Sequence, residues 1–217
     1  NSLVNQSYKK WELIFYDNNS SDRSADIMRS YNDKRIIYIK TKFVNLGLAR
    51  KRAFKHCKGD YITFLDCDDY WDKNKLKIKI KEMIKNKDLG LSFTNSIFFK
   101  NNLKRKLYYS KPKDGYIFEN LLRKCFISFD TVIISMKFIR KLKSDFDERF
   151  SIIHDLDLII RLSKISRFKY IDRVLSYWRI HDNSFSNNKI KRINFENYLF
   201  LSRLIVLSSF IERTYLV

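Results

Sequence analysis

A short apolar run that ends in a cluster of carboxylates constrains this chain more than any other feature. Residues Tyr61–Leu65 are nearly all apolar, and the acidic stretch Asp66–Asp69 follows them directly. A run of this length without polar alternation is typical of a strand buried on both faces. Open α/β sheets bind their ligands just beyond the carboxyl ends of such strands. The sequence therefore predicts an α/β fold with its chemistry at Asp66–Asp69.

The first part of the chain alternates between strand-like and helix-like patterns. In chain order these runs are 11–17, 24–31, 35–40, 47–57, 61–65 and 73–87. The last of them carries Leu76, Ile80, Met83 and Ile84 at helical spacing. This rhythm predicts an α/β domain with a largely parallel sheet.

The rhythm changes after residue 89. Strand-like runs follow at 91–100, 103–110, 131–136, 168–171 and 174–178, and helix-like runs at 117–125, 155–164 and 189–213. No repeat, low-complexity tract or linker interrupts the sequence. We interpret it as one domain over 1–186, followed by a basic amphipathic helix over 187–217.

The composition favours a folded domain with an anionic partner. The chain has 217 residues, 45% of them apolar, and 44 Lys and Arg against 24 Asp and Glu give a net charge of +20. Such a charge fits nucleic acid, a lipid surface or a phosphorylated substrate, although a solvated surface explains most single lysines. The three cysteines cannot all pair and have no C-x-x-C spacing, which excludes a disulfide scaffold and predicts a cytoplasmic protein.

Three carboxylates within four residues repel one another, and a cation relieves that repulsion. Mg²⁺ or Mn²⁺ is typically held by one or two protein carboxylates while a substrate diphosphate completes its coordination. Asp69 and Asp72 could instead cap a helix or occupy its first turn. The position directly after an apolar strand favours the metal site.

Several segments, in order along the chain, resemble the family 2 glycosyltransferases. They are QSYKKWELI at 6–14, DNNSSD at 17–22, NLGLAR at 45–50, GDYITFLDCDDYW at 59–71, HDLDLIIRL at 154–162 and YWRIH at 177–181. The likeness extends over roughly residues 3–186.

The resemblance implies the GT-A fold, a Rossmann-like three-layer α/β sandwich with a mixed, mainly parallel sheet. It also implies transfer of a sugar from a nucleotide-diphosphate sugar, above all a UDP-sugar, to a hydroxyl of a glycan or lipid-linked acceptor, with inversion and with Mn²⁺ or Mg²⁺. The Gln-x-x-Arg-Trp of processive members is absent, which argues for transfer of a single sugar in surface polysaccharide synthesis. The family's opening apolar strand is also absent and the chain starts at Asn1, so we expect the domain to lack its first strand.

The same resemblance assigns roles to individual residues. The residues implied in nucleotide binding are Asp17, Asn18, Ser20, Asp22, Arg50 and Asp66. Asp68 would ligate the metal, His181 would contact the metal or a phosphate, and Asp155 would be the general base that deprotonates the acceptor. The residues expected on the acceptor or phosphate side are Asp69, Trp71, His154 and Arg179.

Alternative roles remain open for some of these side chains. His154 could lower the pKa of Asp155 when protonated, or merely cap the helix at Asp155. Arg161 could bind phosphate, but an ion pair with Asp157 is the stronger expectation. Trp71 fits packing better than a sugar platform.

Two other classes of protein fit parts of the sequence. A haloacid-dehalogenase-like phosphatase also has Asp-x-Asp after a buried strand, but it needs Thr or Val soon after the second Asp, and here Asp69-Tyr70-Trp71 follows. A nucleic-acid-binding protein fits the charge, but zinc spacing and an RNP-like motif are absent from the sequence.

The end of the chain suggests a further partner. Its uncharged stretch 204–211 is far shorter than the roughly 20 residues that span a bilayer. The basic and apolar side chains over 189–213 fit either peripheral contact with an anionic membrane, at its inner face, or packing on the domain.

Overall fold

The computed structural model describes residues 1–142, 144–181, 196–197 and 199–201. The strands are β1 Leu13–Asp17, β2 Ile36–Lys40, β3 Tyr61–Ile62, β4 Tyr70–Trp71, β5 Leu89–Lys100, β6 Leu103–Lys106, β7 Ile133–Ser135 and β8 Arg167–Arg179. The helices are α1 Ser24–Arg29, α2 Leu46–Phe54, α3 Lys75–Lys85, α4 Phe118–Arg123, the 3-10 helix η1 Phe129–Thr131, α5 Met136–Ile139 and α6 His154–Ser163. Residues 196, 197 and 199–201 are helical, and the rest of the helix expected over 187–217 lies outside the described residues.

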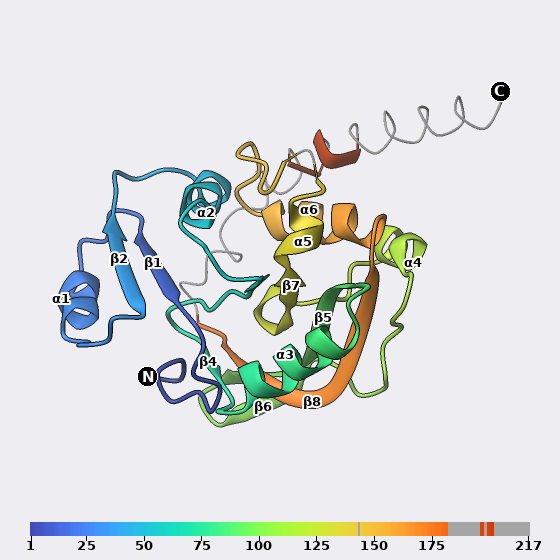
Figure 1. Cartoon of the computed structure of the whole chain (residues 1–217), viewed down its shortest axis with the longest axis horizontal. Coiled ribbons are helices and arrows are strands. Elements are labelled where there is room, and N and C mark those ends of the chain that lie inside the picture. Colours follow the sequence, from blue (N-terminus) through green and yellow to red (C-terminus); the bar gives the residue numbers. More distant parts are fainter. Residues whose placement is uncertain (143, 182–195, 198, 202–217) are drawn as a thin grey trace.

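The strands form two sheets that are not hydrogen-bonded to each other. β1 and β2 pair in parallel and, with α1, stand apart from the body of the molecule (Figure 1). The larger sheet has the order β3-β7-β5-β8-β4, with β6 beside β5. Side chains link the sheets, because Glu12, just before β1, accepts hydrogen bonds from the amides of Lys58 (2.6 Å) and Gly59 (2.9 Å), just before β3.

The larger sheet is mixed, as expected, and its longest ladder is the parallel pair β5–β8. Only β5 and β8 pair in parallel, whereas β3–β7, β7–β5, β5–β6 and β4–β8 are antiparallel. A tight turn explains one of these pairs, since Asn101 adopts a positive φ of 53° between β5 and β6. Asn tolerates this left-handed conformation better than most residues.

Several strands differ in length from their sequence patterns, and β3 and β8 show two different reasons. The run 61–65 forms only the two-residue strand β3, because its single neighbour β7 is itself three residues long and the ladder ends there. The runs at 168–171 and 174–178 form one continuous strand, β8, whose register with β5 shifts between Ile171 and Val174.

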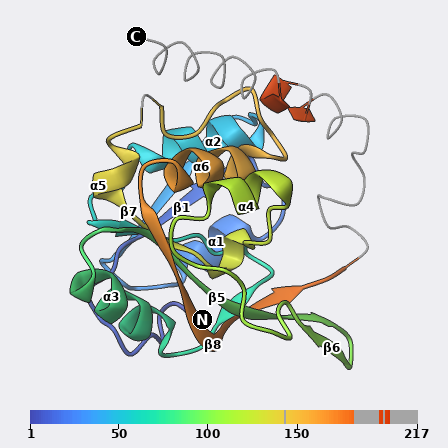
Figure 2. The same ribbon diagram turned by 90° about the vertical axis from the view of Figure 1, so that its right-hand side faces the viewer.

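Hydrophobic side chains pack on both faces of the larger sheet, which gives three layers. Ile134 of β7 joins a cluster with Leu121 of α4 and Leu158 of α6. Ile133, on the opposite face of β7, joins a cluster with Met83 of α3. Figure 2 shows α3 on one side of the sheet and α4 and α6 on the other.

Helix α3 has an unusual buried face. Leu76, Ile80 and Met83 are buried as expected, but Ile84 is 57% exposed. Lys75 and Lys79 are fully buried beside the apolar residues, because positions 75, 76, 79, 80 and 83 lie on one side of a helix of 3.6 residues per turn.

Candidate functional site

The acidic stretch lies in the loop between β3 and β4. The backbone turns there, with the Asp69 amide donating to the Asp66 carbonyl oxygen at 3.1 Å. Asp68 Oδ2 lies 2.8 Å from His181 Nε2, and both side chains are about 40% exposed (40% and 39%). An exposed carboxylate and imidazole at this distance can bind a cation together.

The end of β8 is attached to this loop by its backbone and by Arg179. The Arg179 amide donates to Asp69 Oδ1 at 2.9 Å, and Arg179 Nε donates to the Asp68 carbonyl oxygen at 3.1 Å. The antiparallel pair β4–β8, with Tyr70 opposite Tyr177, sets this arrangement. Sheet pairing therefore brings Arg179 and His181 to the acidic loop from more than a hundred residues away.

Asp69 differs chemically from its neighbours in the loop. Burial raises its pKa to about 7, the bond from the Arg179 amide opposes this shift, and the nearby Asp68 and Asp130 carboxyls add to it. Because its Oδ1 accepts a hydrogen bond from the Arg179 amide, Asp69 ties the acidic loop to the end of β8.

Arg50 of α2 lies on the other side of the acidic loop. Its Nη2 is 3.3 Å from Asp66 Oδ1, and its side chain is only 15% exposed. Its guanidinium lies over the rings of Phe129 (4.9 Å) and Phe64 (5.5 Å), contacts that favour a desolvated cation. Its Nη1 is buried with no partner among the described side chains and backbone, so a donor remains for an anionic ligand.

Asp155 lies in the first turn of α6, within electrostatic reach of Arg50 and Asp66. Burial raises the pKa of its carboxyl, the Arg50 charge opposes this shift and the Asp66 carboxyl adds to it. Its Oδ1 accepts a hydrogen bond from the Leu156 amide at 2.8 Å. A carboxylate with a raised pKa is better suited to accepting a proton than an ordinary surface Asp.

The first residue of α6, His154, is buried. It is 3% exposed, and burial followed by the charge of Arg50 lowers its pKa to about 3. The ring is therefore neutral at neutral pH and supplies no positive charge to lower the pKa of Asp155. It packs between Phe129 and Phe146, with centroids 6.2 and 6.1 Å away.

The loop after β1 is shaped by internal hydrogen bonds. Burial alone would raise the pKa of Asp17, but bonds from the Tyr38 hydroxyl (2.6 Å) and the Ser20 amide (2.7 Å) lower it overall. Asn18 bonds both backbone groups of Val44, at 2.7 and 2.9 Å. Asn19 takes a positive φ of 70°.

This loop faces the acidic loop. Burial raises the pKa of the Cys67 thiol, and the carboxyls of Asp66, Asp68, Asp22 and Asp17 raise it further, in that order. The last two belong to the loop after β1. Asp22 is exposed and accepts a bond from the Ser24 amide at 2.9 Å, which lowers its pKa.

Most of the residues singled out in the sequence come together here, and two are largely covered. Trp71 is 6% exposed, with Lys75 Nζ 4.0 Å from its ring centroid, and His154 is buried as described. Both positions favour support of the site over direct acceptor contact. Arg161 pairs with Asp157 at 2.6 Å, as expected.

A further residue of the site, not predicted from the sequence, is Tyr38, whose hydroxyl donates to Asp17 Oδ2. The parallel register could have revealed it, because Tyr38 lies opposite Phe15 and Asp17 follows two residues later on the same face. Over the described ranges, no group of three or more His, Cys, Asp and Glu side chains converges as a ready metal site. Within the same ranges, no helix has the length and apolar character to cross a bilayer.

Comparison with known proteins identifies the family. The model of the family described as "Glycosyl transferase family 2" matches residues 1–144. The UDP-Glc:alpha-D-GlcNAc-diphosphoundecaprenol beta-1,3-glucosyltransferases WfaP and WfgD of Escherichia coli are 31% and 30% identical to this chain over 193 and 197 residues, covering 88% of it and 74% of each relative.

Solved structures agree on the fold. Staphylococcus aureus TarS 1–349, crystallised with UDP-GlcNAc, matches with a TM-score of 0.71 at 17% identity, over 86% of this chain and 55% of that one. The chain thus spans about half the length of the TarS chain that it matches. With the α/β layers described above, this match shows the GT-A fold, and the chain is a glycosyltransferase that belongs to family 2.

Proposed function

We propose that this enzyme transfers one sugar from a UDP-sugar to a hydroxyl of a glycan or lipid-linked acceptor, with inversion and with the help of a divalent cation. The observation that carries the proposal is the grouping of the Asp68–His181 pair, the Arg50–Asp66 pair and the partly buried Asp155 around one loop. An inverting displacement needs a base at the attacking hydroxyl and positive charge at the leaving diphosphate.

The donor is proposed from the site and from the relatives. WfaP and WfgD are named for UDP-glucose, and TarS was crystallised with UDP and with UDP-GlcNAc. The loop of Asp17, Asn18, Ser20 and Asp22 faces the acidic loop, which suits a nucleotide that spans both. The unpartnered Nη1 of Arg50 would donate to a diphosphate or ribose oxygen.

The side chains at the acidic loop fit a divalent cation. One carboxylate and one imidazole, both partly exposed, supply two ligands, and diphosphate oxygens would supply others. The imidazole favours Mn²⁺ over Mg²⁺, which strongly prefers oxygen ligands. When bound to Asp68 and His181, the cation would neutralise charge on the leaving diphosphate.

Asp155 is proposed as the general base. Its carboxylate would take the proton of the acceptor hydroxyl as the oxygen bonds the anomeric carbon and the bond from that carbon to the diphosphate oxygen breaks. The raised pKa brings its basicity closer to that needed at neutral pH, while the Arg50 charge limits the shift.

The acceptor and its location are proposed from the relatives and the sequence. WfaP and WfgD are named for an acceptor linked to diphosphoundecaprenol. An acceptor of that kind would require the enzyme to work at the cytoplasmic face of a membrane, in surface polysaccharide synthesis. The basic, apolar stretch 189–213 would then supply peripheral contact.

Two substitutions test the division of roles. We expect Asp68→Ala to weaken Mn²⁺-dependent UDP binding by at least about tenfold. We expect Asp155→Asn to leave UDP binding intact and to lower transfer from UDP-glucose to GlcNAc-diphosphoundecaprenol by about 10²- to 10⁴-fold. Calorimetry with and without Mn²⁺ and a radiolabel transfer assay measure both effects.

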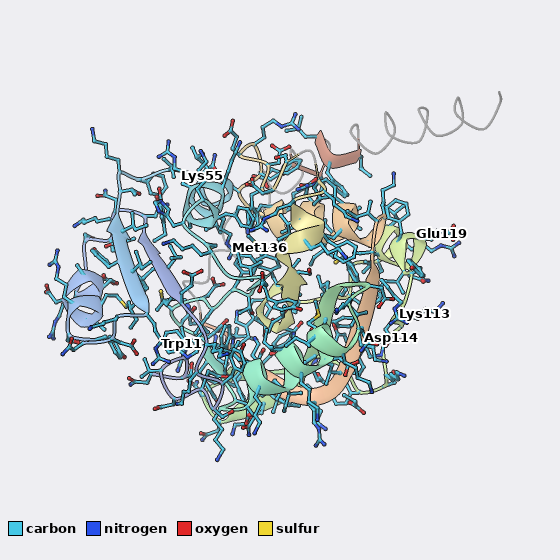
Figure 3. The ribbon with its side chains drawn as sticks, viewed as in Figure 1. Trp11, Lys55, Lys113, Asp114, Glu119 and Met136 are labelled. Carbon is cyan, nitrogen blue, oxygen red and sulfur yellow. The ribbon has the colours of Figure 1, made fainter. Side chains whose placement is uncertain are left out.

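The control is Glu119→Gln on α4, where the side chain is exposed and points away from the ribbon (Figure 3). Normal transfer by Asp155→Asn would refute the base assignment. Equal UDP binding with and without Mn²⁺ in the unmodified enzyme would refute the metal site.

A further inference from the structure

A buried carboxylate from the C-terminal part of the chain contacts the backbone that leads into α6. Glu196 is fully buried. Its Oε1 accepts a hydrogen bond from the Ser151 amide at 2.8 Å, and its Oε2 accepts from the amides of Ile152 (2.7 Å) and Ile153 (3.1 Å). These lengths are typical of charge-assisted bonds.

The three amides immediately precede α6, which carries Asp155 as its second residue. Ile153 is the N-cap residue and provides no side-chain acceptor of its own. Ser151 and Ile153 are buried, so their amides would lose a hydrogen bond if Glu196 were removed. A negative charge near a helix start is also favoured by the helix dipole.

Neighbouring residues fix Glu196 in position. Phe200 is 7% exposed and belongs to the main hydrophobic cluster, and Leu199 packs against that cluster. Figures 1 and 2 both show the short helical stretch that includes Glu196 lying next to the loop before α6.

The segment that Glu196 contacts also touches α2. Asn45, the N-cap of α2, donates from Nδ2 to the Glu148 carbonyl oxygen at 2.9 Å. Arg161 of α6 donates to the carbonyl oxygens of Ser144 and Asp145, each at 2.5 Å. The segment 144–153 is thus anchored near its start by Arg161 and near its middle by Asn45. Glu196 anchors its last residues, which are nearest to Asp155.

We infer that Glu196 is a positioning residue that holds the first turn of α6, and with it the carboxyl of Asp155, beside Arg50 and Asp66. The inference rests on the proposed function, in which Asp155 is the base. It assigns a determinant of turnover to a residue outside the part that the family model matches, residues 1–144. A small displacement of a catalytic group is enough to slow a displacement reaction strongly.

Two variants, Glu196→Gln and Glu196→Asp, distinguish the effect of the hydrogen bonds from the effect of side-chain size. Gln preserves the size but turns an NH₂ group toward at least one of the three amides. Asp preserves the charge and both acceptors with one methylene fewer. Glu119→Gln is again the matched control, because that Glu is exposed.

The first measurement separates kcat from KM. We expect Glu196→Gln to lower kcat for transfer from UDP-glucose by about tenfold or more, with the KM for donor and UDP binding unchanged, and Glu196→Asp to recover part of the loss. Because Glu196 acts through Asp155, adding Glu196→Gln to Asp155→Asn should leave residual turnover unchanged. A purely structural role would make the two losses multiply.

The second measurement is hydrogen exchange, which does not depend on turnover. Glu196→Gln should speed exchange at the amides of 151–158 and leave α2 unaffected. Unchanged exchange there, unchanged kcat, or loss of UDP binding in both Glu196 variants would each overturn the inference. A different result would separate the two proposals. If Asp155→Asn transferred sugar normally while Glu196→Gln still exchanged faster at 151–158, the proposed base would be refuted, but the contact between Glu196 and the start of α6 would stand.

Discussion

The acidic side chains of the site differ in chemistry because their surroundings differ. Asp17 is buried but accepts two good hydrogen bonds, so its pKa falls. Asp69 and Asp155 are partly buried with fewer compensating donors, and the loss of hydration raises their pKa values. Asp17 is therefore a permanent anion that shapes its loop, whereas Asp69 and Asp155 are groups that can exchange a proton.

The neutral state of the buried His154 predicts how the unfolding free energy changes with pH. Its folded pKa of about 3 lies below the ordinary value of 6.5, so the unfolded chain binds the extra proton between these values. Its contribution is complete above pH 6.5 and is lost as pH falls toward 3. In His154→Leu, the fall in unfolding free energy over this range should be shallower by up to about 1.4 kcal/mol per pH unit.

Urea unfolding at pH 4, 5, 6 and 7 measures this difference. Carboxylates also titrate over this range, but they do so in both proteins, and the comparison removes their shared part. Parallel pH profiles for the two proteins would show that His154 is protonated in the folded state.

The elements could be predicted from the sequence where their pattern was local. The helix pattern at 47–57 overlaps α2, which begins one residue earlier, and the pattern at 73–87 contains α3. The motif at 66–69 lies in the loop after β3 and not directly at the end of that strand. Strand lengths could not be predicted, because β3 stops where its neighbour β7 stops. The burial of Lys75 and Lys79 was equally hidden, since their acceptors come from distant segments such as Asp130 and Ser92.

The buried Lys79 of helix α3 predicts a second change of the unfolding free energy with pH. The amine donates to the carbonyl oxygens of Ser92 (3.0 Å) and Thr131. Burial, followed by the charge of Lys75, lowers its pKa well below 10.5. Between this lowered pKa and 10.5 the unfolded chain therefore binds more protons than the folded one, and stability should rise with pH over that range. Lys79→Met should reduce that rise by up to about 1.4 kcal/mol per pH unit.

Lys77→Met is the matched control on the same helix, because Lys77 is exposed. Unfolding free energies at pH 7, 8, 9 and 10 should rise alike in Lys77→Met and the unmodified enzyme. An equal rise in Lys79→Met would mean that the buried amine keeps its proton throughout.

For the whole molecule, side chains must join two sheets that share no strand ladder. The Glu12 carboxylate does so by accepting from the amides that lead into β3. We expect Glu12→Ala to lower the unfolding free energy by about 1.5–3 kcal/mol, the range for hydrogen bonds to a charged group. Glu12→Gln should recover part of the loss, because its amide oxygen still accepts. A loss no larger than that of Glu119→Gln in urea unfolding would contradict this.

The net charge of +20 is a property of the whole molecule. Binding to anionic membranes tests its role most directly. Lys189, Lys191 and Arg192 precede the apolar stretch 204–211, and each basic residue near an anionic bilayer contributes about 1 kcal/mol. We expect co-sedimentation with vesicles that contain phosphatidylglycerol, weakening from 50 to 500 mM salt, and none with neutral vesicles.

A chain truncated after Leu201 tests membrane contact without removing the residues that pack on the domain, because it retains Glu196 and Phe200. The shortened enzyme should hold UDP normally and bind anionic vesicles more weakly, since it has lost the apolar residues that would enter the bilayer. Full binding after truncation would move the contact to another basic surface, such as the exposed side chains of β6. Absence of binding by the intact chain at 50 mM salt would leave the lysines a role in solubility alone.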